Sequence, residues 1–258
     1  MGRLTEIAPG VLVATSDYAA TTTTVVTGAP GSGECLLIDP AVTVADLAEL
    51  AGSLAVMGLR PGAAWSTHPH WDHVLWSRAL GDAPRYAAPA AVAIAETERD
   101  GIIDELEQSA PGHDLPLVGR LTALDAFVIP WDGPAAQVVV HDGHAPGHGA
   151  VFLPDTGVLV AGDMCSDLEI PLLDTMATDP LGDYRTGLER LSAVLGVSQV
   201  VPGHGHVGDT GEMRRRFAAD SAYLDAVAKG EAYPDPRLTG APQWMHTMHE
   251  SQVRFYQR

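Results

Sequence analysis

The sequence predicts an α/β protein in which two β-sheets pack face to face with helices on their outer sides, an αββα sandwich. Each half of the chain places a group of short β-type runs first, then a helix, then a further strand, and this alternation is typical of layered α/β folds. A length of 258 residues is ample for a sizeable core, and 46% hydrophobic with 19% charged residues is ordinary for a globular protein. Periodicity alone leaves other α/β layouts open.

Three strands open the first half of the chain. Runs rich in Thr, Val and Ile predict them at residues 10–15, 21–27 and 35–39. A helix follows over Thr43–Gly58, with Thr43 as its candidate N-cap. Its apolar side chains recur at steps of three and four residues and predict one buried stripe: Val44, Leu47, Leu50, Leu54 and Met57.

The next strand, at residues 63–66, leads directly into a loop that is rich in His and Asp. After that loop we expect a helix over residues 72–80, a short strand at 85–88 and a helix over 89–108 that is interrupted at Gly101. Residues 109–121 hold two prolines and two glycines, which predicts an irregular connector.

The second half repeats the pattern of strands followed by a helix. The strands are expected at residues 137–141, 150–153, 158–161 and 198–201, and the helices at 183–195 and 210–230. Residues 243–258 have the spacing of a surface helix. We therefore divide the chain into a main domain, residues 1–232, and a C-terminal extension, residues 233–258.

The charge balance restricts the partners of the protein. A formal net charge of −18 repels polyanions, so nucleic acid is a poor partner and none is expected. No apolar run approaches the length of about 20 residues that spans a membrane, so no membrane contact is expected. The N-terminus lacks the apolar core of a secretory signal and the chain has only two cysteines, which predicts a cytoplasmic protein with reduced thiols. A small-molecule substrate is the expected partner, and a homo-oligomer remains open.

The loop after the strand at 63–66 carries four potential metal ligands within six residues: His68, His70, Asp72 and His73. Alternate side chains of an extended segment share a face, so His68 and His70 point the same way. Asp72 and His73 follow where the chain must turn and can reach a second point. Imidazole and carboxylate are ligands that zinc and similar cations accept, so the pattern predicts two adjacent metal positions served by one loop.

This His-x-His-x-Asp-His stretch resembles the signature of the metallo-β-lactamase-fold hydrolases. Three later stretches follow in the order that this superfamily shows: His-Ala-Pro-Gly-His at 144–148, Ala-Gly-Asp at 161–163 and Pro-Gly-His-Gly at 202–205. The resemblance covers about residues 10–225, and it implies the αββα fold that the order of elements suggests. The motifs are specific for the superfamily and much less so for the substrate, because one scaffold hosts many chemistries.

The resemblance implies a ligand for each motif position. One metal would be held by His68, His70 and His148; the other would take Asp72, His73 and His204, with Asp163 bridging both. The implied cofactors are two divalent cations, with zinc expected and iron or manganese as alternatives. Asp72 and Asp163 are the expected catalytic residues. Two residues near the motifs need separate roles: His144 is expected to orient a ligand through a hydrogen bond, and Cys165 ranks below Asp163 as a ligand.

The implied activity is a dinuclear metal-dependent hydrolase that cleaves a small ester, thioester or lactone with metal-bound hydroxide. The Asp72, Asp163 and His204 set resembles glyoxalase II-like and lactonase-like members more than true β-lactamases, whose second site usually lacks this bridging Asp. A β-lactamase, an iron-dependent oxidoreductase and a metal-binding protein without turnover are the alternatives. Trp71 is the aromatic residue expected to line the substrate pocket, because it is adjacent to the ligands.

Overall fold

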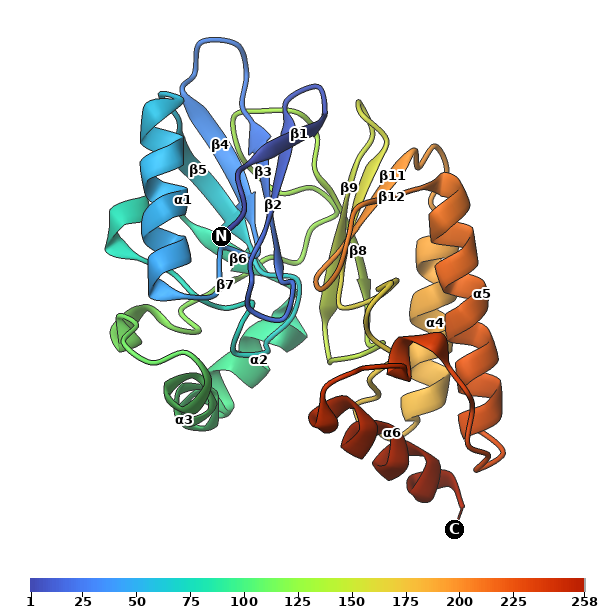
Figure 1. Ribbon diagram of the computed structural model, residues 1–258. Coiled ribbons are helices and arrows are strands. Elements are labelled where there is room, and N and C mark those ends of the chain that lie inside the picture. The colour runs from blue at the N-terminus through green and yellow to red at the C-terminus, as the bar shows by residue number, and fades with distance from the viewer. Residues whose placement is uncertain (258) are drawn as a thin grey trace.

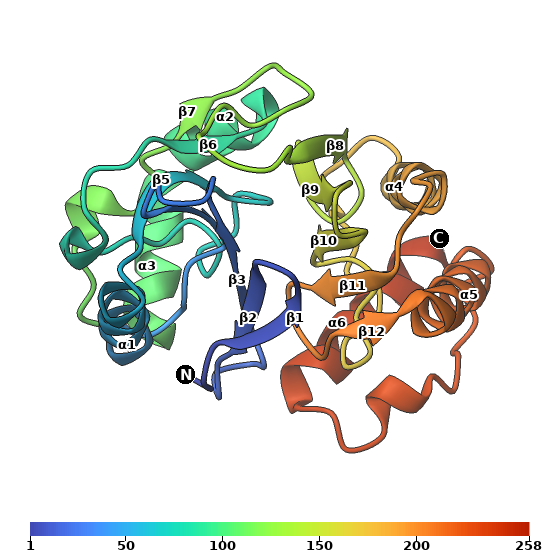
Figure 2. The ribbon, with the colours of Figure 1, turned by 90° about the horizontal axis from the view of Figure 1, so that it is seen from above.

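A computed structural model describes residues 1–257 and shows two mixed β-sheets lying face to face with helices outside them (Figure 1). Seen from above, α1 (Val44–Val56) and α3 (Arg99–Ser109) lie beyond one sheet, whereas α4 (Pro180–Ser192) and α5 (Thr210–Val227) lie beyond the other (Figure 2). The predicted αββα sandwich is confirmed. Within residues 1–257, no helix is both long enough and apolar enough to cross a lipid bilayer.

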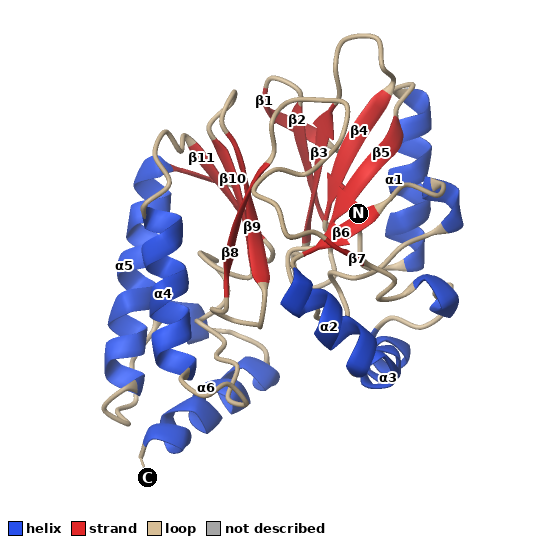
Figure 3. Cartoon of the chain, turned by 180° about the vertical axis from the view of Figure 1, so that it is seen from behind, coloured by secondary structure: helices blue, strands red, loops and turns tan. Residues whose placement is uncertain are grey.

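The first sheet has seven strands in chain order, antiparallel from β1 to β4 and parallel from β4 to β7. They are β1 (Thr5–Ala8), β2 (Val11–Thr15), β3 (Thr22–Thr27), β4 (Glu34–Ile38), β5 (Arg60–Trp65), β6 (Arg85–Ala87) and β7 (Thr122–Ala123). Between β6 and β7 the chain forms α2 (Pro89–Thr97) and α3, which lie at one end of the sheet (Figure 3).

The second sheet has five strands in the order β12-β11-β10-β9-β8, in which only β10 and β11 are parallel. They are β8 (Gln137–His141), β9 (His148–Leu153), β10 (Val158–Gly162), β11 (Gln199–Pro202) and β12 (Gly208–Asp209). The C-terminal helix α6 (Gln243–Tyr256) lies on the same side as α4 and α5, at the end of the molecule where α2 and α3 also lie (Figure 1).

Strand alternation builds the core on both faces of the first sheet. In β4, Leu36 and Ile38 pack between the sheets with Trp65, whereas Leu37 packs outward against α1. All four side chains are fully buried. Trp65 also joins the two sheets directly, because its Nε1–H donates to the carbonyl oxygen of Gly149 over 2.7 Å.

Most predicted elements are present, and the differences lie beside the loops of the site. Thr43 caps α1 as expected, since its hydroxyl accepts from the Asp46 amide. The helix expected over residues 72–80 is wrong: the chain makes turns there, and only Arg78–Leu80 forms a 3-10 helix. The helix expected over 89–108 breaks at Glu98 instead of Gly101, which separates α2 from α3.

The remaining comparisons concern one unexpected strand, one strand start, the connector and the C-terminal helix. The strand β1 was not expected, and β9 begins at His148, two residues earlier than predicted. The connector at 109–121 is irregular apart from a 3-10 turn at Leu115–Leu117. The surface helix expected over 243–258 is α6; its last predicted residue, Arg258, lies outside the described residues.

Candidate metal centre

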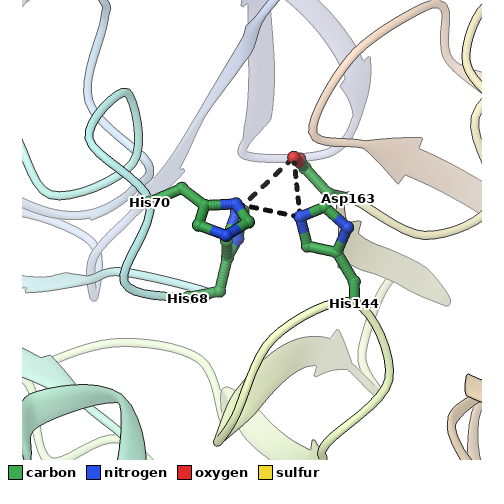
Figure 4. Close-up of side chains that lie close together, drawn as sticks. All are labelled: His68, His70, His144 and Asp163. Carbon is green, nitrogen blue, oxygen red and sulfur yellow. Dashed lines mark hydrogen bonds and ion pairs between the residues drawn. The ribbon is translucent and has the colours of Figure 1, made fainter. Parts of the chain in front are cut away.

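The candidate ligands lie on four loops that meet where the two sheets face each other. The loop after β5 carries His68, His70, Asp72 and His73; His144 precedes β9, Asp163 follows β10, and His204 follows β11. The strands β5, β10 and β11 end at this edge, so their carboxyl ends deliver side chains to one place. Figure 4 shows His68, His70, His144 and Asp163 pointing toward one another.

The first group of donor atoms consists of three imidazoles and one carboxylate: His68, His70, His144 and Asp163. The His144 Nε2 atom lies 3.0 Å from His70 Nδ1 and 3.3 Å from Asp163 Oδ2. The His68 Nε2 atom lies 3.4 Å from the same carboxylate oxygen. The four donors therefore surround one point.

The second group consists of Asp72, His73 and His204. The His204 Nε2 atom lies 3.2 Å from Asp72 Oδ2 and 3.4 Å from His73 Nε2. Asp163 reaches this group too, because its Oδ1 atom is 3.2 Å from His73 Nε2 and its Oδ2 atom 3.4 Å from His204 Nε2. The Asp163 carboxylate thus stands between the two groups.

These donors fit metal ions. Two ligands bound tetrahedrally to zinc at about 2.0–2.1 Å lie about 3.3 Å apart, which matches the donor separations in both groups. Two of the donor atoms, His68 Nε2 and Asp163 Oδ1, are buried and have no hydrogen-bond partner. A buried polar atom without a partner is costly, and a cation between the groups would satisfy both atoms.

The electrostatics of the groups point to the same conclusion. Burial lowers the pKa of His68 and His70, that of His70 to about 3, and neighbouring imidazoles add to the effect. Burial opposes charge on Asp163, but the imidazoles around it hold its pKa well below the usual range. Burial also opposes charge on His73 and His204, yet the facing carboxylates raise the pKa of both well above the ordinary value. In the first group, His68 and His70 are therefore neutral imidazoles beside an anionic carboxylate, the form that binds metal.

Asp39 orients two of the imidazoles from behind. Its carboxylate accepts from the Thr67 amide over 2.8 Å and from the Thr67 hydroxyl over 2.7 Å. The same hydroxyl lies 3.0 Å from His68 Nδ1, and Asp39 Oδ2 lies 3.0 Å from His73 Nδ1. Carboxylates in this position fix the ring orientation of metal-binding histidines. From the sequence, Asp39 was predicted only as the last residue of the strand at 35–39.

Backbone carbonyls orient two more imidazoles. The Leu172 oxygen lies 3.1 Å from His144 Nδ1, and the Ala19 oxygen 3.0 Å from His204 Nδ1. A carbonyl oxygen can only accept, so each Nδ1 carries the proton and each Nε2 lone pair faces the donor group. Both rings are therefore held in the tautomer that can bind metal through Nε2.

The structure brings together six of the seven predicted ligands and places His144 where His148 was expected. His148 is the first residue of β9, it pairs in register with His141 of β8, and its Nε2 accepts from the backbone amide of Asp163 over 3.2 Å. It lies in neither donor group. His144 has a φ of 72°, a left-handed conformation that is uncommon outside glycine and is often found at functional sites.

The surroundings of three other residues near the motifs show what each can do. A Cβ atom on Gly203 would lie 2.0 Å from Asp163 Oδ1, so a glycine is needed for the carboxylate to stay between the groups. Cys165 is fully buried and its Sγ faces the Met213 carbonyl oxygen at 3.9 Å, away from the donors. Glu169, which was not among the predicted site residues, lies with its Oε1 atom 4.0 Å from His204 Nδ1 and groups with Asp163 and His204.

A cleft of about 1450 Å³ opens over the donor groups. Trp71 lines it, as expected from its position beside the ligands, and Tyr18 meets the Trp71 ring edge-on at 5.6 Å between centroids. Its apolar wall comes from α2, α3, the segment at 172–177 and α6: Ile94, Ile102, Leu172, Leu173, Met176, Trp244 and Met248. The C-terminal extension therefore forms part of the site.

The extension is also connected to a ligand. Gln252 of α6 is fully buried; its Oε1 accepts from the Leu173 amide over 2.6 Å and its Nε2 donates to the Pro171 carbonyl over 3.1 Å. The Leu172 carbonyl between these two residues is the one that holds His144 Nδ1. The Tyr223 hydroxyl accepts the other Nε2 proton over 2.8 Å. Gln252 thus fixes the backbone that fixes His144.

Comparison with known proteins agrees with this geometry. A family described as "Metallo-beta-lactamase superfamily" matches residues 18–224. The chain is 31% identical over 219 residues to a hydroxyacylglutathione hydrolase of Rhodobacter capsulatus, covering 82% of this chain and 75% of that one. It is 31% identical over 134 residues to a hydroxyacylglutathione hydrolase of Thermosynechococcus vestitus, an alignment that covers 52% of this chain and only 45% of that relative.

Among solved structures, TTHA1623 in a di-iron-bound form is similar to this chain. The TM-score is 0.62 at 26% identity, and the alignment covers 79% of this chain and 97% of the other.

Proposed function

The chain belongs to the metallo-β-lactamase superfamily, and from this premise we propose that it is a dinuclear metal-dependent hydrolase of a small ester, thioester or lactone. One observation supports this activity above the others. Two groups of metal-ligand type share the Asp163 carboxylate at the base of a large cleft. A purely structural zinc site would be closed and mononuclear.

The proposed ligands follow the geometry. His68, His70 and His144 would hold one cation and Asp72, His73 and His204 the other, with Asp163 shared. When bound, two such cations lower the pKa of water and polarise a carbonyl group. Zinc is the expected metal because imidazoles dominate the donor set. Iron is the alternative that the di-iron form of TTHA1623 suggests.

The residues of the chain itself orient the metal ligands and exclude water from the site. Asp39 and the carbonyls of Leu172 and Ala19 hold four imidazoles in fixed orientations, directly or through Thr67. Prearranged ligands cost no reorganisation during a reaction. The apolar wall around Trp71 provides a place for an acyl group beside the donors. Neither cysteine is available as a nucleophile, since both are fully buried.

The experiment that tests this function compares two histidines four residues apart. Wild type, His144→Ala and His148→Ala are assayed for bound metal and for hydrolysis of an ester, a thioester, a lactone and a β-lactam. We expect about two ions per wild-type chain, and a loss of one ion and of turnover in His144→Ala. The His148→Ala variant keeps both donor groups complete and is expected to retain its metal.

The alternatives give different results in the same experiment. Preferred turnover of the β-lactam would identify a β-lactamase, and an iron-containing coloured protein would favour an oxidoreductase. About one ion or none, with no turnover on the panel, would indicate a metal-binding protein without this activity. Loss of metal in His148→Ala with full retention in His144→Ala would refute the ligand assignment.

A further inference from the structure

Apart from the histidines of the donor groups, the charged side chains lining the cleft all have one sign. Eight carboxylates line it, and none of the lining residues in the described part of the chain is Lys or Arg. The carboxylates are Asp72, Glu98, Glu105, Asp142, Asp163, Glu169, Asp174 and Asp183. The charge of the cleft lining is therefore acidic without a basic side chain, which is a more specific feature than the negative net charge of the whole protein.

Bound cations would offset only the inner carboxylates. Asp72 and Asp163 lie among the metal donors, and Glu169 lies beside them. The other five form an outer ring on two walls: Glu98 and Glu105 belong to α3 and its N-terminus, whereas Asp142, Asp174 and Asp183 lie near the start of α4. None of these five takes part in an ion pair within residues 1–257.

The carboxylates near the start of α4 act on Asp183 as like charges. Burial, and then the charges of Asp142, Asp179 and Asp174, raise the pKa of Asp183. A ring of one sign around a cleft concentrates ligands of the opposite sign and repels those of its own.

Aromatic rings in the same cleft favour the same kind of ligand. Trp71 and Trp244 line it from opposite halves of the chain, Trp71 beside the donors and Trp244 on α6, where it is 44% exposed. The faces of aromatic rings attract cations, and Trp does so most strongly. Carboxylates and indole rings together suit an ammonium group attached to an apolar chain.

We propose that the cleft selects ester or thioester substrates carrying an ammonium group and discriminates against anionic leaving groups such as glutathione. The inference rests on the proposed hydrolase function and specifies its substrate class. Glutathione has two carboxylates and one ammonium group, so its thioesters would bring net negative charge into an acidic cleft without a basic side chain to receive it. The chain would then differ in substrate from the two hydroxyacylglutathione hydrolases that it resembles.

The test uses three acetyl thioesters that differ in the charge of the thiol part: acetylthiocholine, its uncharged tert-butyl isostere and acetyl-mercaptopropionate. Thiol release by the metal-loaded protein gives kcat/KM for each at low and high ionic strength. We expect the cationic substrate to exceed the anionic one by about tenfold or more at low salt, with a smaller ratio at high salt. An anionic substrate hydrolysed as well as the cationic one would overturn the inference.

Variants show whether the outer carboxylates are responsible for the preference for a cationic substrate. Glu98 makes no capping hydrogen bond to α3, and Glu98 and Glu105 are both exposed, so the double variant Glu98→Gln/Glu105→Gln is expected to fold. It should reduce the cation-to-anion ratio by about threefold or more. The matched control is Asp100→Asn/Asp104→Asn, which removes two exposed carboxylates of the same helix that do not line the cleft. An equal reduction in both would mean that overall charge, and not the ring, sets the preference.

A binding measurement separates this inference from the proposed function. The uncleavable thioether counterparts of the three substrates are titrated into the metal-loaded protein, with Trp fluorescence as the readout. If no thioester is cleaved but the cationic thioether binds about tenfold more tightly than the anionic one, the hydrolase assignment fails and the charge preference holds. Equal binding of the cationic and anionic thioethers refutes the preference whatever the enzymatic result.

Discussion

Gln252 offers a sharp test of how the C-terminal extension serves the metal centre. The substitution Gln252→Met keeps the approximate length of the side chain and removes its polar end. In the structure that end makes three hydrogen bonds while fully buried, to the Leu173 amide, the Pro171 carbonyl and the Tyr223 hydroxyl. The substitution therefore leaves a buried backbone amide without its partner.

The magnitude follows from these contacts. Three hydrogen bonds contribute about 1 kcal/mol each, and an amide left unsatisfied costs a further 1–3 kcal/mol or so, partly in place of its lost bond. We expect the free energy of unfolding to fall by about 3–4 kcal/mol, which corresponds to a decrease of roughly 6–16 °C in Tm for a chain of this size. Gln257→Met is the matched control, because Gln257 is exposed and its Nε2 donates only to the Gly230 carbonyl.

The more informative effect is on metal binding. Releasing Pro171 and Leu173 frees the Leu172 carbonyl that holds His144 Nδ1. Loss of such an outer contact typically costs about 10–100-fold in metal affinity. Zinc affinity is measured by competition with a chelator at a temperature where circular dichroism shows wild type and both variants to be folded.

The outcomes separate two roles for Gln252. A less stable Gln252→Met protein with wild-type zinc affinity would refute the link to His144 and leave only a packing role. Unchanged stability would refute the hydrogen-bond network itself. An equal loss of zinc affinity in Gln257→Met would show that any change in the C-terminal segment has this effect.

Three further predictions concern single positions. Thr43→Ala removes the N-cap of α1 and should lower the free energy of unfolding by about 1 kcal/mol in a urea titration, with a Thr43→Ser control close to wild type. Neither Cys35, whose pKa burial raises to about 12, nor Cys165 should react with a thiol reagent until the chain is unfolded; a fast thiol in the native protein would contradict their burial. Gly203→Ala should displace the Asp163 carboxylate and reduce bound metal, and unchanged metal content would show that the carboxylate can shift without loss.

The elements that could be predicted from the sequence are those whose pattern is local. The helix α1 and the strand β4 depend on neighbours along the chain, and the ends of both were placed within two residues. Of the stripe predicted for α1, Leu47, Leu50 and Leu54 are buried, whereas Val44 and Met57 at its two ends are exposed. The helix expected at 72–80 failed because tertiary contacts control that segment. Asp72 and His73 must reach the second donor group, and the turns that allow this leave no regular helix before Arg78.

The residues of the candidate site were also easiest to predict where their pattern is local. The loop carrying His68, His70, Asp72 and His73 could be found because its ligands are nearly contiguous. The family resemblance implied His148 as the ligand and His144 as a residue that orients a ligand. In the structure β9 begins at His148, which holds that side chain within the sheet, and the preceding loop supplies His144 to the donor group. The useful signal was the position of the strand start, not the Pro-Gly-His motif.

Residues that orient the ligands could not be recognised from local sequence. Asp39 acts on Thr67 and His73, which lie in a loop that begins well beyond α1, and Gln252 acts on a ligand more than a hundred positions away. The periodicity of the sequence does not reveal which residue orients which ligand, because each such pair depends on how strands and helices from different parts of the chain meet.

The metal donors and the wall of the cleft come from different parts of the chain, which explains why the family is easier to recognise than the substrate. The donors come from loops at the edge of two sheets whose order is set by the fold, so any chain with this fold and these motifs can bring them together. The cleft above them is built from α3, the segment at 172–177 and α6, which carry no family motif. If the charge of this outer wall sets the preference, exchanging its carboxylates will change which thioester is cleaved while metal content stays constant. A change in metal content instead would mean that wall and centre cannot be separated.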